Sequence, residues 1–424
     1  MSTVFSRYLH ALATLLLMAA CSSGGSPPPS AEALLASTIR NDTRLALVRS
    51  KAKQLVGKAL TAGSVYPAVF IRDLNTFTEL AIEVQGGAIV RDQLRQFLDK
   101  QGADGNIVDG INTADGSTFK GTVETDQESS LVQAIAKYVA ITGDKAFLSE
   151  DVRGTSVIVR LENAMLFLYT SRWSSKYGMA YGATRADWGD VQPEDSNGTI
   201  YNELSHPSIS IYDNAMLTLA LVDMQALENA ARRDPNPWAV RERELRAAVR
   251  TYLWTGTQFI PHIYLEKGSP FPADYDESKM YFQGGTAVAI QAGLLLPGEV
   301  SAAFTRMIKN KVDSGSRSVG VSLYKPYPAG FFKNTDYMGQ EYQYQNGGDW
   351  PWFGARIIQQ MVNYGQVDTA YREFDPMLNF VVRDDGFFEW YTPAGVKQGS
   401  GDYRGTAGQI VLAIDLLQAW AAKH

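Results

Sequence analysis

The sequence has very little cysteine and histidine. Cys21 is the only cysteine among 424 residues, which excludes an internal disulfide and leaves no thiol further along for catalysis or metal binding. Of the four histidines, only His206 and His262 lie away from the chain ends, and they form neither a metal-ligand spacing nor a Ser/His/Asp arrangement. Neither GxGxxG nor GxxxxGK[ST] occurs. We therefore expect no metal, no cofactor and no bound phosphate.

A basic excess is also missing. The net charge of -6 argues against a nucleic-acid partner. After Cys21, no apolar run is long enough to cross a membrane. The sequence contains 45% hydrophobic and 20% charged residues, which is the balance of a folded domain. We expect this domain to be a monomer.

The N-terminus is typical of an exported protein. Arg7 precedes an apolar run from Leu9 to Met18, followed by Ala19, Ala20 and Cys21. This end of the run resembles the lipobox of bacterial lipoproteins, which implies lipidation of Cys21. Residues 1–21 are then a signal peptide, and residues 22–30 (SSGGSPPPS) form a flexible tether. The anchor would be the only membrane contact, in the periplasm or at the cell surface. An ordinary signal peptide that contains a cysteine is the alternative.

The rest of the chain, residues 31–424, has the apolar spacing of an all-α domain. Leu131, Ile135, Tyr138 and Val139 recur at helical spacing, and similar stripes follow Leu217 and Ile410. Short strand-like alternation occurs only at 259–264 and 386–391. No interior linker or clean internal repeat divides the sequence. Further helices are expected to begin near Ala31, Phe77, Val157, Trp238, Thr286, Val300, Phe353 and Asp368.

Polar clusters lie beside several of these helices. Arg72 and Asp73 follow an aromatic run that begins at Tyr66. They are either a surface ion pair worth under ~1 kcal/mol or a fixed carboxylate for sugar hydroxyls. Asp126 and Glu128 precede the Leu131 stripe, where acids also stabilise a helix N-terminus.

A third cluster places two acids around an aromatic ring, in the order Asp187, Trp188, Gly189 and Asp190. Glycosidic cleavage needs a protonated carboxylic acid beside the leaving oxygen. A neighbouring carboxylate or an apolar wall raises a carboxyl pKa in the required direction. A solvated turn is the simpler interpretation of the same residues.

Two late clusters combine aromatic and polar residues. Gln345, Asn346 and Gly347 lead to Trp350 and to a proline suited to a helix start. Glu389 is enclosed by aromatic residues that include Trp390 and Tyr391. An unpaired carboxylate in apolar surroundings costs free energy unless it has a partner or a task. The alternative is a strand residue whose carboxylate points to water.

Taken in order, these segments resemble those of the six-hairpin glycosidases, from about Tyr66 to the end of the chain. This superfamily includes debranching amylo-α-1,6-glucosidases, glucoamylases, alkaline/neutral invertases and the processing-α-glucosidase and mannosylglycerate-hydrolase group. The resemblance implies an all-α (α/α)6 toroid of six helical hairpins with a loop-borne active site. It implies an enzyme that acts on oligosaccharides or other glycosides.

The resemblance also implies residue roles. Asp190 is the general acid and Glu389 the general base, while Asp187 is a sugar-binding or pKa-tuning neighbour that could exchange roles with Asp190. The implied substrate-binding residues are Tyr66, Arg72, Asp73, Asp126, Trp188, Gln345, Asn346, Gly347, Trp350, Trp390 and Tyr391. The segment before Asp187 fits no subfamily closely, so the sugar stays open, with α-glucosides and α-mannosides first.

The expected reaction is inversion. For it, the Asp190 and Glu389 carboxyls must lie about 6.5–9.5 Å apart. Two other classes remain. A polysaccharide lyase or sugar epimerase on the same barrel would abstract a proton from carbon with Tyr, His or Arg. A non-catalytic surface glycan-binding lipoprotein would keep aromatic platforms without needing the acid pair.

Overall fold

The computed structural model describes residues 29–121 and 123–424. Cys21, the signal peptide and most of the expected tether lie outside the described residues. The first helix, α1 (Ala31–Asn41), begins where the sequence predicts it, with the Ser30 hydroxyl accepting a hydrogen bond from the Ala33 N–H. No helix among the described residues is long and apolar enough to cross a membrane.

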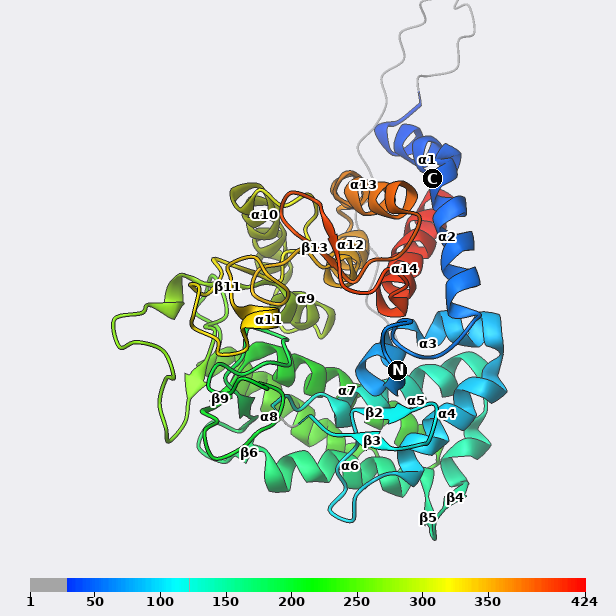
Figure 1. Cartoon of the computed structure of the whole chain (residues 1–424). Helices are drawn as coiled ribbons and strands as arrows, with labels where there is room; N and C mark the ends of the chain where they lie inside the picture. The colour runs from blue at the N-terminus through cyan, green and yellow to red at the C-terminus, as the bar shows by residue number, and fades with distance from the viewer. Residues whose placement is uncertain (1–28, 122) are drawn as a thin grey trace, which may run out of the picture.

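Six helices form a closed inner ring. Each contacts the next, and the last returns to the first. In order they are α3 (Ile71–Gln85), α5 (Gln127–Thr142), α7 (Ile211–Ala230), α9 (Gln283–Gln291), α12 (Pro351–Asn363) and α14 (Arg404–Ala421). The ring is an (α/α)6 barrel, which confirms the predicted fold class (Figure 1).

An outer helix pairs with each inner one. The outer helices are α2 (Thr43–Val56), α4 (Gly87–Asp99), α6 (Val157–Ser171), α8 (Asn236–Tyr252), α10 (Pro297–Ser314) and α13 (Val367–Asp384). Helix α1 packs on α14, and the short α11 (Thr335–Met338) lies within a long loop.

Burial explains which helices are inner and which are outer. Helix α12 buries 11 of its 13 residues, whereas the 17-residue α8 buries only Trp238, Leu245 and Val249. A helix with apolar or tightly packed residues all round must be enclosed, while a helix with one apolar stripe can face water. The chain alternates between inner and outer rings, so the inner helices begin at the same end of the barrel. The loops before them therefore converge there.

Strands among the described residues are two or three residues long, and all but β4 and β5, which precede the outer helix α6, belong to these loops. β1 (Ala68–Phe70), β2 (Gly110–Asn112) and β3 (Thr118–Phe119) form one antiparallel sheet. A second joins β8 (Gly182–Ala183), β9 (Pro207–Ile209) and β10 (Ile263–Tyr264). The two-stranded pairs are β4 (Asp151–Val152) with β5 (Thr155–Ser156), β6 (Trp173–Ser174) with β7 (Met179–Ala180), β11 (Tyr281–Phe282) with β12 (Leu323–Tyr324), and β13 (Trp390–Tyr391) with β14 (Lys397–Gln398).

The helix starts show where the sequence patterns were weaker. The helix expected near Phe77 begins six residues earlier, at Ile71, which places Arg72 and Asp73 inside its first turn. The sequence analysis did not identify α4 as a separate helix. Gly86, with φ of 91°, ends α3 and starts α4, so a single glycine separates the two helices.

Candidate active site

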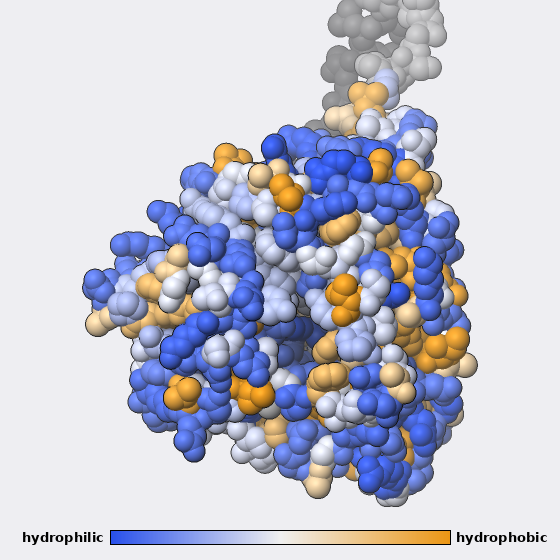
Figure 2. Space-filling view, viewed as in Figure 1, coloured by the Kyte–Doolittle hydropathy of each residue, from blue (hydrophilic) through white to orange (hydrophobic). Residues whose placement is uncertain are grey.

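A central pocket of about 80 Å³ lies where the inner helices begin. Five of its lining residues, Arg72, Asp73, Trp350, Trp352 and Tyr403, come from the first turns of α3 and α12 or the residues just before α12 and α14. The complete lining is Ala62, Tyr66, Phe70, Arg72, Asp73, Trp188, Asp190, Tyr344, Gln345, Trp350, Trp352, Glu389 and Tyr403. Figure 2 shows a hollow near the middle of the viewed face, bordered mainly by hydrophilic residues.

Glu389 forms one wall of this pocket and is only 3% exposed. The Tyr66 hydroxyl lies 2.8 Å from both carboxylate oxygens, and the Ser400 N–H donates to Oε2 at 3.1 Å. Burial raises the pKa of Glu389 to about 7, against the opposing effect of these donors; the charges of Asp73 and Asp190 raise it further. The interpretation of Glu389 as a strand residue pointing to water is wrong, because its carboxylate is enclosed and hydrogen-bonded.

Asp190 forms another wall and is less enclosed, with 29% of its side chain exposed. Its Oδ2 lies 3.2 Å from the Arg72 guanidinium, which also donates to the Trp188 carbonyl. The Asp190 N–H donates to Gln345 Oε1 at 3.1 Å. The Arg72, Asp190 and Gln345 clusters, far apart in sequence, therefore meet in one hydrogen-bonded group.

Asp73 is also buried, in the first turn of α3. It accepts a 2.5 Å hydrogen bond from the Tyr403 hydroxyl. Burial raises its pKa, while Arg72 and the Tyr403 hydrogen bond act in the opposite direction. Asp126 lies outside the central pocket, where its Oδ2 accepts from the Tyr212 hydroxyl at 2.7 Å and is 3.9 Å from Arg72. It lines a neighbouring cavity that also contains Asp73 and Asp190.

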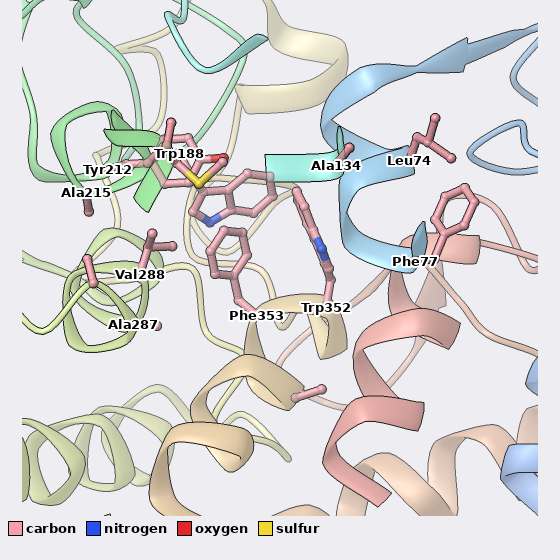
Figure 3. Packing of buried hydrophobic residues seen from close by; sticks show 14 of the residues in the cluster. Leu74, Phe77, Ala134, Trp188, Tyr212, Ala215, Ala287, Val288, Trp352 and Phe353 are labelled. Atoms are coloured by element: carbon pink, nitrogen blue, oxygen red, sulfur yellow. The ribbon is translucent and has the colours of Figure 1, made fainter. Parts of the chain in front are cut away.

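The inner wall of the pocket is aromatic. Trp188 stacks on Phe353 with a 4.6 Å centroid distance, and Trp352 meets it edge-on at 5.2 Å (Figure 3). Trp350 also meets Trp188 edge-on, at 4.7 Å. Trp188 is only 1% exposed, so packing uses most of its surface. Trp188 still lines the central pocket, and its role in substrate binding stays a prediction. The Trp352 indole N–H has no hydrogen-bond partner among the described residues, which makes it a candidate donor to a ligand.

Asp187 does not reach the pocket. Its backbone has a positive φ of 54°, its side chain is fully buried, and its oxygens accept from the Gly285 N–H at 2.9 and 3.0 Å. Burial raises its pKa to about 8, opposed by the N–H groups of Gly285 and Gly284. The Asp187 carboxyl therefore binds the N-terminus of α9. Asp190, only three residues later in the sequence, lines the central pocket instead.

The remaining candidates brace the surrounding loops. The Asn346 side chain accepts from the Tyr327 N–H and donates to the Tyr327 carbonyl, and the Gly347 N–H donates to Ser322. Tyr391 is buried and stacked on Phe380, with a centroid distance of 4.0 Å. Asn346, Gly347 and Tyr391 do not line the central pocket, and the contacts above place them in the packing of its loops. Their assignment as substrate-binding residues stays a prediction.

Trp390 lines an adjoining aromatic cleft of about 780 Å³ rather than the central pocket. The cleft shares Tyr66, Tyr344 and Glu389 with the pocket, and its other aromatic members are Tyr337 and Tyr342. Glu389 therefore lies between the central pocket and this cleft.

Sequence reasoning missed Phe70, Tyr344 and Tyr403 as pocket residues, and did not include Trp352 among its site residues. Tyr403 directly precedes α14, and Trp352 lies in the first turn of α12. Polar or aromatic residues at the start of a predicted helix are the signal that marks both positions. Tyr344 offers no such signal, because it lies in a loop at a positive φ of 49°.

The two body histidines lie elsewhere. His206 Nδ1 is 2.8 Å from the Gly268 carbonyl, and His262 Nδ1 is 3.2 Å from Glu277. Neither lines the central pocket. In the described part of the chain, no cluster of three or more His, Cys, Asp or Glu side chains could hold a metal ion.

Comparison with known proteins gives matches in structure alone. No protein-family profile and no curated protein matches the sequence. A GH63 mannosylglycerate hydrolase from Thermus thermophilus, solved with Tris, aligns over 86% of this chain and 99% of its own, with 14% identity and a TM-score of 0.64. The same hydrolase was solved with Tris and D-glycerate.

Two rhamnosidases are also similar. The GH78 rhamnosidase of Bacillus sp. GL1 aligns over 88% of this chain and 34% of its own, with 15% identity and a TM-score of 0.62. A rhamnosidase from Klebsiella oxytoca, with rhamnose bound, aligns over 88% and 63%, with 14% identity and a TM-score of 0.56. The fold of this chain is that of the six-hairpin, helical-barrel glycosidases.

Proposed function

We propose that this protein is a glycoside hydrolase that cleaves glycosidic bonds with Asp190 and Glu389. The observation that carries the proposal is the central pocket, where two carboxyls from different loops stand among buried acids and aromatic rings. The fold shared with glycosidases supports it, although fold alone does not determine activity.

In the proposed inverting reaction, Asp190 protonates the glycosidic oxygen while Glu389 activates a water molecule on the opposite face of the sugar. The donors around Glu389 suit a base, because Tyr66 and the Ser400 N–H hold the carboxylate in place. A base with a pKa near the working pH combines a large ionised fraction with useful basicity. Asp73 and the free Trp352 N–H are placed to bind hydroxyls of the cleaved sugar.

One contact favours the reverse assignment. The Arg72 guanidinium lies 3.2 Å from the Asp190 carboxyl, whereas the raised pKa of Glu389 favours its proton. In that version, Glu389 is the acid and Asp190 the base. Substrates with different leaving groups distinguish the two assignments. Loss of the general acid slows hydrolysis most for substrates with poor leaving groups, whereas loss of the general base slows hydrolysis of all substrates alike.

The test is a panel of aryl glycosides and oligosaccharides, starting with α-glucosides and α-mannosides, with NMR detection of released sugar. Mannosylglycerate belongs in the panel because of the Thermus hydrolase. We expect turnover of at least one glycoside by the wild type and its loss in Asp190→Asn and Glu389→Gln. Asp115→Asn changes an exposed acid on the β2–β3 turn and is the matched control. Ultraviolet-absorbing products would indicate a lyase, and binding without sugar release would indicate a glycan-binding protein.

We also propose that Cys21 anchors the enzyme to a bacterial membrane and that hydrolysis takes place outside the cytoplasm. The lipobox-like end of the apolar N-terminal run supports this. Metabolic labelling with a fatty acid should label the wild type and not Cys21→Ala. Unlabelled, soluble wild type would contradict the proposal.

A further inference from the structure

An acidic cavity of about 210 Å³ opens beside the central pocket. The two share Phe70, Arg72, Asp73 and Asp190. The acidic cavity is further lined by Ile71, Asp109, Phe119, Gly121, Glu124, Asp126, Gln127 and Thr199. Asp190 therefore stands at the boundary between the two spaces, which is where the oxygen of a scissile bond would lie if Asp190 protonates it.

Several oxygens of this cavity have no hydrogen-bond partner among the described residues. They are Asp109 Oδ1, Glu124 Oε2, Asp126 Oδ1 and Gln127 Oε1. Glu124 is 7% exposed and Asp126 is 0% exposed. Buried polar atoms are nearly always hydrogen-bonded, so these unpaired oxygens indicate missing donors at this cavity and at the adjoining one that Glu124 and Gln127 also line. All four oxygens accept hydrogen bonds, and a ligand with several hydroxyl groups supplies the complementary donors.

The charges around the cavity are mostly negative. Its lining has the carboxyls of Asp73, Asp109, Glu124, Asp126 and Asp190 but only one cation, Arg72. Arg72 already lies between Asp126 and Asp190.

Two nearby cations outside the lining offset part of this negative charge. Against the larger effect of burial, Lys120 acts to lower the pKa of Asp109, and Arg185 acts to lower those of Glu124 and Asp126, although both cations also have partners of their own. Lys120 binds the Ile107 carbonyl and Glu128, and Arg185 binds Asp213 and the Val123 carbonyl. Burial raises the pKa of several cavity carboxyls, that of Glu124 to about 7, so part of the negative charge is replaced by protons near neutral pH. A protonated carboxyl can still bind a hydroxyl group, but it gives a carboxylate ligand no counter-charge.

We infer that the acidic cavity holds the leaving group of the proposed hydrolysis and selects a hydroxyl-rich group without negative charge, a sugar or polyol, over one that carries a carboxylate. The inference rests on the proposed function. Hydroxyl donors would satisfy the unpaired oxygens of Glu124 and Asp126, whereas a carboxylate would bring a like charge beside them. The acidic cavity would therefore give this protein a different leaving-group preference from that of an enzyme that releases glycerate.

A matched pair of substrates tests the inference. Glycosylglycerol and glycosylglycerate, with an α-glucosyl or α-mannosyl group, differ in the leaving group only by a hydroxymethyl or a carboxylate. We expect wild-type kcat/KM to be at least about 30-fold higher for the glycerol compound. In the double variant that combines Glu124→Gln with Asp109→Asn, the preference for the glycerol compound should fall to about 3-fold or less. The control variant Asp115→Asn should keep the wild-type preference. Equal or faster turnover of the glycerate compound would overturn the inference.

Binding provides a readout that does not require turnover. Calorimetric titration of both compounds into Glu389→Gln, which retains every acidic-cavity residue, should show the same preference for the uncharged compound. Preference in binding, with no hydrolysis of these compounds or of any glycoside in the panel above, would refute the proposed function and keep the selectivity. Hydrolysis with equal binding of the two compounds, or a preference unchanged in the double variant, would refute the selectivity and keep the proposed function.

Discussion

The two carboxyls of the central pocket occupy opposite environments. Glu389 is 3% exposed, with one tyrosine hydroxyl and one backbone N–H as donors. Asp190 has 29% of its side chain exposed and pairs with the Arg72 guanidinium. One wall raises the pKa of its carboxyl by burial, and the other places its carboxyl beside a guanidinium and in partial contact with solvent. The comparison shows how one barrel end can give two carboxyl groups different surroundings, which two-carboxylate hydrolysis uses to give them different roles.

Removing either carboxyl should have the largest effect. Asp190→Asn and Glu389→Gln are each expected to lower kcat/KM by about 10³-fold or more on a poor leaving group, since each removes a proton-transfer group. Steady-state kinetics with a disaccharide substrate measures this. Asp187→Asn is a control from the same loop, because an amide oxygen can still accept from the Gly285 N–H. It should change kcat/KM by less than about 3-fold.

Activated leaving groups sharpen the same comparison. If Asp190 is the acid, Asp190→Asn should recover to within about 10-fold of the wild type on a dinitrophenyl glycoside, and Glu389→Gln should not. Recovery of Glu389→Gln alone would exchange the two roles. A loss in Asp187→Asn as large as in Asp190→Asn would show that the buried carboxyl contributes to catalysis.

The pH dependence follows from the raised pKa of Glu389, about 7. A general base must be ionised, so kcat/KM should fall about 10-fold per pH unit below 7 and level off above it. If Glu389 is instead the acid, it must hold its proton, and kcat/KM should fall above pH 7. A profile from pH 4.5 to 9 distinguishes these limbs, and a profile flat across pH 7 would contradict the assigned environment.

Tyr66→Phe should change the surroundings of the Glu389 carboxyl. It removes the hydroxyl that donates to both oxygens of Glu389, an interaction that lowers the pKa of this carboxyl. The pKa should therefore rise, and if Glu389 is the base, kcat/KM at pH 6 should drop about 10-fold. The shift of the kinetic limb to higher pH is the decisive readout. A uniform loss without this shift would indicate that Tyr66 acts only in binding.

The smallest effect is expected in stability. Between the ordinary carboxyl pKa of 4.5 and about 7, folded Glu389 holds a proton that the unfolded chain releases, so the free energy of unfolding falls as pH rises through this window. Glu389→Gln removes that penalty and should raise the free energy of unfolding by about 1–3 kcal/mol at pH 8 and much less at pH 4.5. Denaturant unfolding at both pH values measures it. A variant less stable than the wild type at pH 8 would contradict the account.

The apolar spacing predicted an all-α domain because each helix has a buried stripe, and the resemblance to the six-hairpin glycosidases implied the barrel, which the ring of helix contacts confirms. Polar clusters beside helices marked loops that meet at one end of this barrel. The predicted site residues that line the central pocket number eight, namely Tyr66, Arg72, Asp73, Trp188, Asp190, Gln345, Trp350 and Glu389. Their catalytic and binding roles stay predictions.

The pattern could not separate Asp187 from Asp190. The positive φ of Asp187 turns its side chain toward α9, and the two residues it needs there, Gly284 and Gly285, lie about a hundred positions later in the sequence. A glycine at 285 is required because a Cβ would lie 2.6 Å from Asp187 Oδ1. Side-chain direction depends on such distant packing, which residue type and spacing do not encode.

NMR observation of glycoside cleavage, with the wild type and Glu389→Gln side by side, tests the central claim most directly. The account predicts that the wild type releases a sugar whose first-formed anomer is inverted relative to the substrate, and that Glu389→Gln releases essentially none. Release of the retained anomer would contradict the inverting mechanism. Equal release by the two proteins would contradict the carboxylate pair itself.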